Sequence, residues 1–150
     1  MNKEMKQGIK DFIAEVNPMI KVHFQSYDLE CDVFEEEVYI GRTYDKRTDE
    51  YFANFVHELN PQCNFNPFLL SILHEIGHIE TWTDEDVDDK DATYAILKMQ
   101  FDSLEKTDLV MQEYCDMYFR IPLEYNATQW GIDFAMNHPD LMNKYSWLHN

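Results

Sequence analysis

Three side chains suited to metal and acid–base chemistry lie close together in the motif His74-Glu75-Ile76-Gly77-His78. The apolar residues before the motif predict a buried helix. Side chains four positions apart on a helix project from one face, so the two histidines can offer imidazole nitrogens to one zinc ion. Glu75 lies next to that face, where it can take a proton from a metal-bound water and pass it to a leaving amine. The motif therefore predicts a zinc site with a general base beside it.

A catalytic zinc site usually has three protein ligands, so one more ligand is expected outside the motif. We favour Glu124, which begins a second predicted helix. Ala127, one turn further on, is small enough to let that helix pack closely over the motif helix. Glu113 and Asp116 on the preceding helix are alternatives. Asp84 is another, because it stands where the metzincin pattern has its third histidine, although the glycine of that pattern is absent.

The motif and the helix carrying Glu124-x-x-Ala127-x-x-Trp130 together resemble the ImmA/IrrE-type metallopeptidases of bacteria and their mobile elements. Those proteins have the pattern His-Glu-(apolar)-Gly-His followed by Glu-x-x-Ala-x-x-Phe-Ala. The resemblance implies a small zincin fold and cytoplasmic, site-selective proteolysis, often of a transcriptional repressor. By the same analogy His74, His78 and Glu124 are ligands and Glu75 is the general base. The gap between the two patterns is longer here, so residues 91–119 would be an inserted helical element.

The amino-acid composition and net charge indicate a globular protein and disfavour some classes of partner. The chain has 150 residues, of which 45% are hydrophobic and 15% aromatic, which predicts a single globular domain over 1–150. Its net charge of −17 would repel nucleic-acid backbones and anionic membranes, so neither is expected as a partner. Solubility is the simplest explanation of the excess acid, and a basic peptide substrate is the alternative.

The sequence also favours a cytoplasmic protein. Cys31, Cys63 and Cys115 are odd in number and widely spaced, which predicts neither a disulfide framework nor a cysteine metal knuckle. The basic start of the chain lacks the apolar segment of a signal peptide, and no apolar run is long enough to cross a bilayer.

Hydrophobic periodicity predicts an α+β fold, with a short antiparallel sheet of about three strands and a mainly helical C-terminal half that carries the active-site helices. The predicted strands are Met19–Tyr27, Leu29–Phe34 and Glu37–Tyr44, joined as a meander. The predicted helices cover residues 3–16, 49–59, a segment opened by Asn66 and Pro67, 91–119 and 122–136, followed by a short amphipathic tail. The segment 91–119 is one helix or two helices broken near 106–108, with Ile96 and Met99 among its buried positions.

Together these features predict a zinc metallopeptidase that acts on a cytoplasmic protein or peptide. Tyr118, Tyr125 and His138 are candidate donors to the oxyanion, and segment 37–42 is a candidate edge strand for pairing with substrate. The alternative is a non-catalytic metal-binding module, or a degenerate peptidase that survives as an interaction module. The sequence gives neither the substrate nor the oligomeric state.

Overall fold

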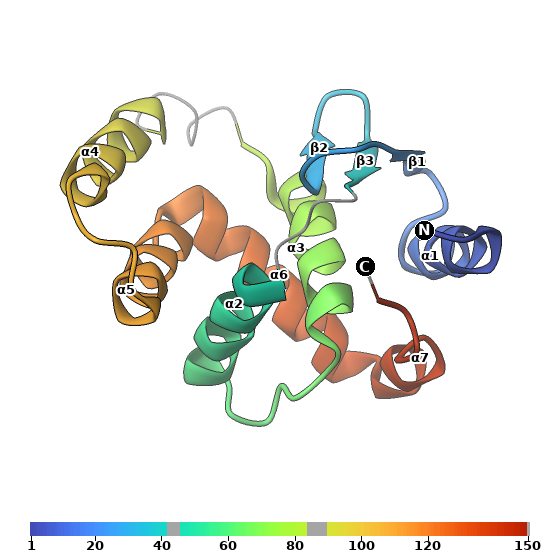
Figure 1. Ribbon diagram of the computed structural model, residues 1–150. Helices are drawn as coiled ribbons and strands as arrows, with labels where there is room; N and C mark the ends of the chain where they lie inside the picture. Colours follow the sequence, from blue (N-terminus) through green and yellow to red (C-terminus); the bar gives the residue numbers. More distant parts are fainter. Residues whose placement is uncertain (42–45, 84–89, 150) are drawn as a thin grey trace.

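The computed structural model describes residues 1–41, 46–83 and 90–149 and has the predicted α+β fold, a small sheet followed by a mainly helical half (Figure 1). Its strands are β1 (Lys21–Phe24), β2 (Glu30–Asp32) and β3 (Glu37–Ile40). Its helices are α1 (Lys3–Val16), α2 (Lys46–Leu59), α3 (Pro67–Thr81), α4 (Lys90–Asp102), α5 (Asp108–Phe119), α6 (Pro122–Asn137) and α7 (Pro139–Lys144). The predicted helices are thus present, and the segment 91–119 forms two of them.

Helix α3 carries the histidine motif and runs through the middle of the molecule (Figure 1). Asn66 caps the helix, as predicted, because its side chain accepts a hydrogen bond from the Phe68 N–H at 2.9 Å and Pro67 occupies the first turn. The sheet and α1 lie on one side of α3, and α2 and α5 lie on the other. Ten of its fifteen residues are buried, so its position is fixed from several directions.

Helices α3 and α6 cross at small residues. A Cβ atom on Gly77 would lie 2.3 Å from the backbone oxygen of Ala127, and one on Gly131 would lie 3.3 Å from Cβ of Leu73. The backbones can approach this closely only because these side chains are absent or small. The close packing predicted from Ala127 is therefore confirmed, and it sets the distance between the two helices that carry the site.

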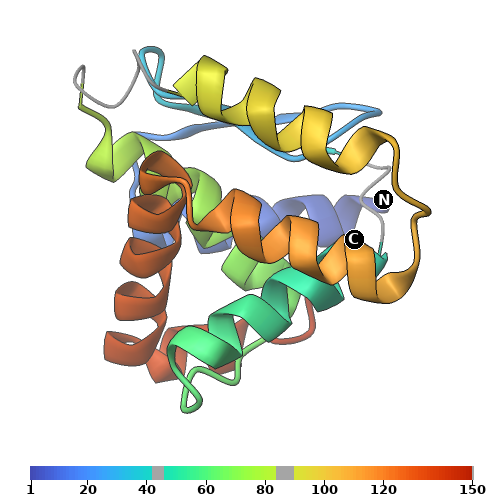
Figure 2. The same cartoon turned by 90° about the vertical axis from the view of Figure 1, so that its left-hand side faces the viewer.

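The main apolar core joins α3 to α1, β3, α2, α6 and the C-terminal segment. A second, smaller apolar cluster lies between α4 and α5, with Leu97, Phe101 and Ile121 buried in it. Figure 2 shows these two helices side by side at the outside of the molecule. Within the described residues, every helix is too short or too polar to cross a bilayer.

The face of α4 that packs inward differs from the predicted one. Ile96 is 58% exposed and Met99 is 77% exposed, whereas Leu97 and Phe101 are buried. The prediction assumed one continuous apolar stripe over 91–119. Because the segment breaks into two helices that pack on each other, the contact with α5 selects the inward face of α4.

The antiparallel meander is wrong for one of its two strand pairs. The strand order is β1-β3-β2, in which β2 pairs antiparallel with β3 but β1 pairs parallel with it. The reason is that residues 25–29 pass across the end of β3, where the Gln25 N–H donates to the Ile40 oxygen at 3.0 Å. A Cβ atom on Gly41 would lie 1.6 Å from the Tyr27 oxygen, so a glycine is needed for this crossing.

The same topology corrects the predicted substrate edge. Strand β3, within the segment 37–42, is the central strand, so both of its edges are already paired. The edge strand next to α3 is β2. The last residues of the third predicted strand, from 42 onward, lie outside the described residues.

Candidate metal centre

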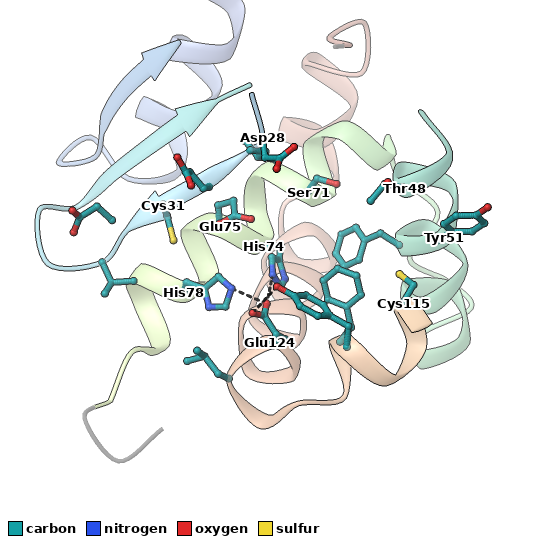
Figure 3. Close-up of a pocket in the computed structure, with 18 of the residues that line it drawn as sticks. Asp28, Cys31, Thr48, Tyr51, Ser71, His74, Glu75, His78, Cys115 and Glu124 are labelled. Carbon is teal, nitrogen blue, oxygen red and sulfur yellow. Dashed lines mark hydrogen bonds and ion pairs between the residues drawn. The ribbon is translucent and has the colours of Figure 1, made fainter. Parts of the chain in front are cut away.

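His74, His78 and Glu124 converge where α3 and α6 face each other, as predicted (Figure 3). Oε2 of Glu124 lies 2.8 Å from Nε2 of His74 and 2.9 Å from Nε2 of His78. All three side chains are buried, and their ligand atoms lie within 4.8 Å of one another. Such a group of two imidazoles and a carboxylate could hold a metal ion.

Local structure explains this convergence. The two histidines are one turn apart on α3, and their ring centroids are 4.6 Å apart. Pro122 opens α6, which places Glu124 in its first turn. The positive end of the helix dipole stabilises a carboxylate there. The folding of each helix therefore presents its ligand to the same buried point.

Thr128 fixes the orientation of the His74 ring. Its hydroxyl donates to the backbone oxygen of Glu124 at 2.8 Å and lies 2.9 Å from Nδ1 of His74. The hydroxyl has one proton, so both contacts are hydrogen bonds only if Nδ1–H of His74 is the donor to Thr128. In the neutral ring the lone pair of Nε2 then faces Oε2 of Glu124. Two electron-rich atoms 2.8 Å apart need a proton or a cation between them, which is the arrangement of a metal-binding histidine.

The charge state of Glu124 also suits a ligand. Burial by itself raises the pKa of this carboxyl, but hydrogen bonds and charge interactions with His74 and His78 lower it well below its ordinary value. Glu124 is therefore an anion at neutral pH, although it is 4% exposed. A buried carboxylate of this kind requires positive partners, which a metal ion would provide.

Glu75 lies beside the three ligands, half-buried, at the wall of a cleft. Burial raises the pKa of its carboxyl, the nearby histidines lower it, and the charge of Glu124 raises it again. A hydrogen bond with Cys31 of β2 has a smaller, lowering effect. The net effect is a pKa above the ordinary value, which is the direction that makes a carboxylate a stronger base.

The cleft has a volume of about 780 Å³ and opens beside the three ligands. Residues 28–34, which include β2, form one wall, and side chains from α2 and α5 form the other. Figure 3 shows Cys31 and Glu75 on the β2 side, with Tyr51 and Cys115 across the cleft. Its lining residues include acids from the β2 wall, and no lysine or arginine is among the described residues that line it. The cleft is large enough for several residues of an extended chain and is negatively charged.

The other predicted ligands do not join this group. Glu113 is exposed on α5, and Asp116 accepts a hydrogen bond from Gln112 at 3.0 Å. Asp84 lies outside the described residues. Among the described residues, Glu124 is the carboxylate that meets both histidines.

Sequence reasoning missed three residues at the site. Thr128 follows Glu124 by one helical turn, and that spacing could have indicated a contact with the same ring. Tyr94 donates a hydrogen bond to Glu124 from α4, and Cys31 reaches Glu75 from β2. No local pattern marks these two, because their positions depend on how α4 and the sheet pack around α3.

Comparison of this chain with protein-family models, with curated proteins and with solved structures finds no match. The function is therefore inferred from the geometry and chemistry of the site.

Proposed function

We propose that this protein is a zinc-dependent peptidase in which His74, His78 and Glu124 hold the metal and Glu75 is the general base. The observation that carries the proposal is the meeting of three buried ligand atoms beside a carboxylate at the wall of an open cleft. Catalytic zinc sites use three protein ligands and leave one position for water, whereas structural sites use four. Among the described residues three ligands meet here, which favours the catalytic arrangement.

Zinc is the metal that suits this donor set best. Two imidazoles and one carboxylate are a common ligand set of catalytic zinc, and calcium or magnesium would favour oxygen ligands alone. A zinc ion bound here would supply Lewis-acid chemistry, because it lowers the pKa of water and polarises a carbonyl group.

The residues around the metal would then have separate roles in hydrolysis. Glu75 accepts a proton from the attacking water while the water oxygen bonds to the peptide carbonyl carbon. Glu75 then passes that proton to the amide nitrogen as the carbon–nitrogen bond breaks. Thr128 would keep Nε2 of His74 directed at the metal by accepting a hydrogen bond from Nδ1–H of that ring.

The three predicted oxyanion donors differ in position. Tyr118 lies in the cleft, but its hydroxyl donates to Oε1 of Glu124 at 3.1 Å. Tyr125 does not line the cleft. His138 follows the other end of α6, where its Nδ1 donates to the Phe134 backbone oxygen at 2.8 Å. The geometry therefore supports an oxyanion role for neither Tyr125 nor His138.

Substrate would enter along β2. This strand is an edge of the sheet, and it forms a wall of the cleft beside Glu75. An extended peptide can add to such an edge through backbone hydrogen bonds. The proposed substrate is thus a protein segment in extended conformation, and β2 takes the role that was predicted for segment 37–42.

The resemblance to the ImmA/IrrE-type metallopeptidases supports the same proposal, because it implies the same ligands and the same base. Helices α4 and α5 span most of the stretch that is longer here than in that family. A protein substrate in the cytoplasm is the setting we propose, and the widely spaced cysteines favour a reducing compartment.

The test uses untagged, zinc-loaded protein and a library of fluorogenic peptides. We expect the wild type to cleave some members, and Glu75→Gln to bind zinc equally well but cleave those members at least about 100-fold more slowly. A Glu75→Gln variant that cleaves at the wild-type rate would remove Glu75 as the base. A wild type that binds one zinc and cleaves neither the library nor unfolded protein would favour the non-catalytic module.

A further inference from the structure

The two oxygens of Glu124 have separate partners. Oε2 faces Nε2 of both histidines, whereas Oε1 accepts hydrogen bonds from the hydroxyl groups of Tyr94 and Tyr118. The carboxylate is therefore held from both sides. Its orientation is set by two phenols at one oxygen and two imidazoles at the other.

Both phenols are suited to permanent donation. Burial raises the pKa of Tyr94 and of Tyr118 well above the ordinary value, and the charge of Glu124 acts in the same direction. A phenol keeps its proton at physiological pH even at its ordinary pKa of about 10, so the contacts of both hydroxyls with Oε1 are donated hydrogen bonds. The two rings stack at a centroid distance of 5.3 Å with an interplanar angle of 26°, which restricts their movement.

The two tyrosines come from different helices, and one of those helices lies outside the main core. Tyr118 is on α5, next to Phe119, which packs against that core. Tyr94 is on α4, none of whose described residues belongs to the main core. Helix α4 is held instead by the smaller cluster of Leu97, Phe101 and Ile121.

We infer that Tyr94 and Tyr118 are positioning residues for the metal ligand Glu124, and that Tyr94 makes the packing of α4 part of the metal centre. Two donors at Oε1 already fix the carboxylate before metal binds, so Oε2 has one orientation toward the metal. Binding then costs little further rotational entropy of the Glu124 side chain, which raises the affinity for metal. If α4 moves away, one of these donors is lost, and the affinity for metal falls. The inference rests on the proposed metal centre but does not depend on hydrolysis.

The first test removes one hydroxyl at a time and keeps the ring. Zinc affinity is measured by competition with a chromophoric chelator for wild type, Tyr94→Phe, Tyr118→Phe and the matched control Tyr125→Phe. Tyr125 is next to Glu124 on α6 but does not line the cleft. We expect the dissociation constant to rise about tenfold for each of the first two variants. We expect less than a twofold change for the control.

A second readout reports geometry. With cobalt(II) in place of zinc, the visible spectrum depends on the ligand field, so a freely rotating carboxylate should change the band positions in Tyr94→Phe and Tyr118→Phe. Unchanged zinc affinity and unchanged cobalt spectra in both variants would overturn the inference while leaving the metal centre intact. A wild type that binds neither metal would overturn the inference and the proposed function together.

The role of α4 is tested by a substitution on this helix at a residue other than Tyr94. Leu97→Ala loosens the small cluster without touching Glu124, and Met99→Ala is its control, because Met99 is exposed on the same helix. We expect Leu97→Ala to weaken zinc binding several-fold in the wild type but to add little in Tyr94→Phe, because the link is already broken. Equal losses in both backgrounds would overturn the role of α4, and circular dichroism confirms that each variant is folded.

Discussion

Nε2 of His74 lies 2.8 Å from Oε2 of Glu124, although fifty positions separate them in the chain. The contact exists because Gly77 and Ala127 let α3 and α6 approach closely, one turn away from each ligand. Small residues at the crossing thus have a functional consequence. They bring the imidazoles and the carboxylate within reach of one cation.

Enlarging Gly77 should separate the two helices. A Cβ atom there would lie 2.3 Å from a backbone oxygen, which cannot move aside as a side chain could. We expect Gly77→Ala to lower the free energy of unfolding by about 1–3 kcal/mol, despite the better helix propensity of alanine. Urea denaturation measures this loss, and the affinity for zinc should fall with it.

Gly131→Ala is the matched control for Gly77. Its Cβ atom would lie 3.3 Å from Cβ of Leu73, which is tight but close to ordinary contact. The gain in helix propensity should offset much of the strain, so we expect a smaller change in stability. Equal stability losses in Gly77→Ala and Gly131→Ala would contradict the special role of the Gly77 crossing.

Removing the hydroxyl of Thr128 should weaken metal binding without changing the shape of the core. Thr128→Val deprives Nδ1–H of His74 of its acceptor, so the tautomer that directs Nε2 at the metal is no longer favoured. We expect zinc affinity to fall about tenfold or more. Thr128→Ser keeps the hydroxyl and should retain most of the affinity. Wild-type affinity in Thr128→Val would show that Thr128 does not orient the ring.

Truncation of Glu124 should have two effects. Zinc affinity should be largely lost, because one of three ligands is gone. The metal-free protein should also lose about 3 kcal/mol of stability, since the buried hydroxyl groups of both tyrosines lose their acceptor and Nε2 of both histidines loses the carboxylate that it faces. Metal titration and thermal unfolding of Glu124→Ala measure these effects. Glu113→Ala, an exposed acid on α5, should change neither; if it abolishes zinc binding instead, the ligand assignment is wrong.

The charge of the cleft should select substrates. Asp28 and Glu30 are exposed at the β2 wall, and the described residues that line the cleft include no lysine or arginine. We expect peptides with lysine or arginine near the cleaved bond to have a several-fold higher kcat/KM than matched glutamate peptides, and added salt to reduce the difference. Asp28→Lys should reduce that preference, and Glu4→Lys, an equal charge change on α1, should not. Equal rates for both peptide sets would exclude this selection.

The ligands could be predicted from the sequence because each depends on local order. Spacing on one helix places His74 and His78 on one face, and Glu124 begins a helix whose small residues indicate close packing. The sheet topology could not be predicted in this way. It depends on how residues 25–29 cross against Gly41, which is a contact between segments and not a periodic pattern.

The environment of the ligands was harder to predict for the same reason. Periodicity indicates that α4 is amphipathic, but it does not say which element covers it. Ile96 and Met99 were therefore predicted to be buried and are exposed. Tyr94 reaches Glu124 from a helix packed at the outside, and no periodic pattern indicates that contact. The residues that hold a ligand in place are set by tertiary packing.

Metal content tests the central claim most directly. Untagged wild-type protein and the variant His78→Ala are dialysed with zinc, washed free of unbound metal, and analysed by native mass spectrometry and elemental analysis. We predict one zinc ion per chain in the wild type and close to none in His78→Ala, with both proteins folded. A folded wild type that takes up no zinc or other divalent metal, or a His78→Ala variant that retains one zinc, would contradict the account.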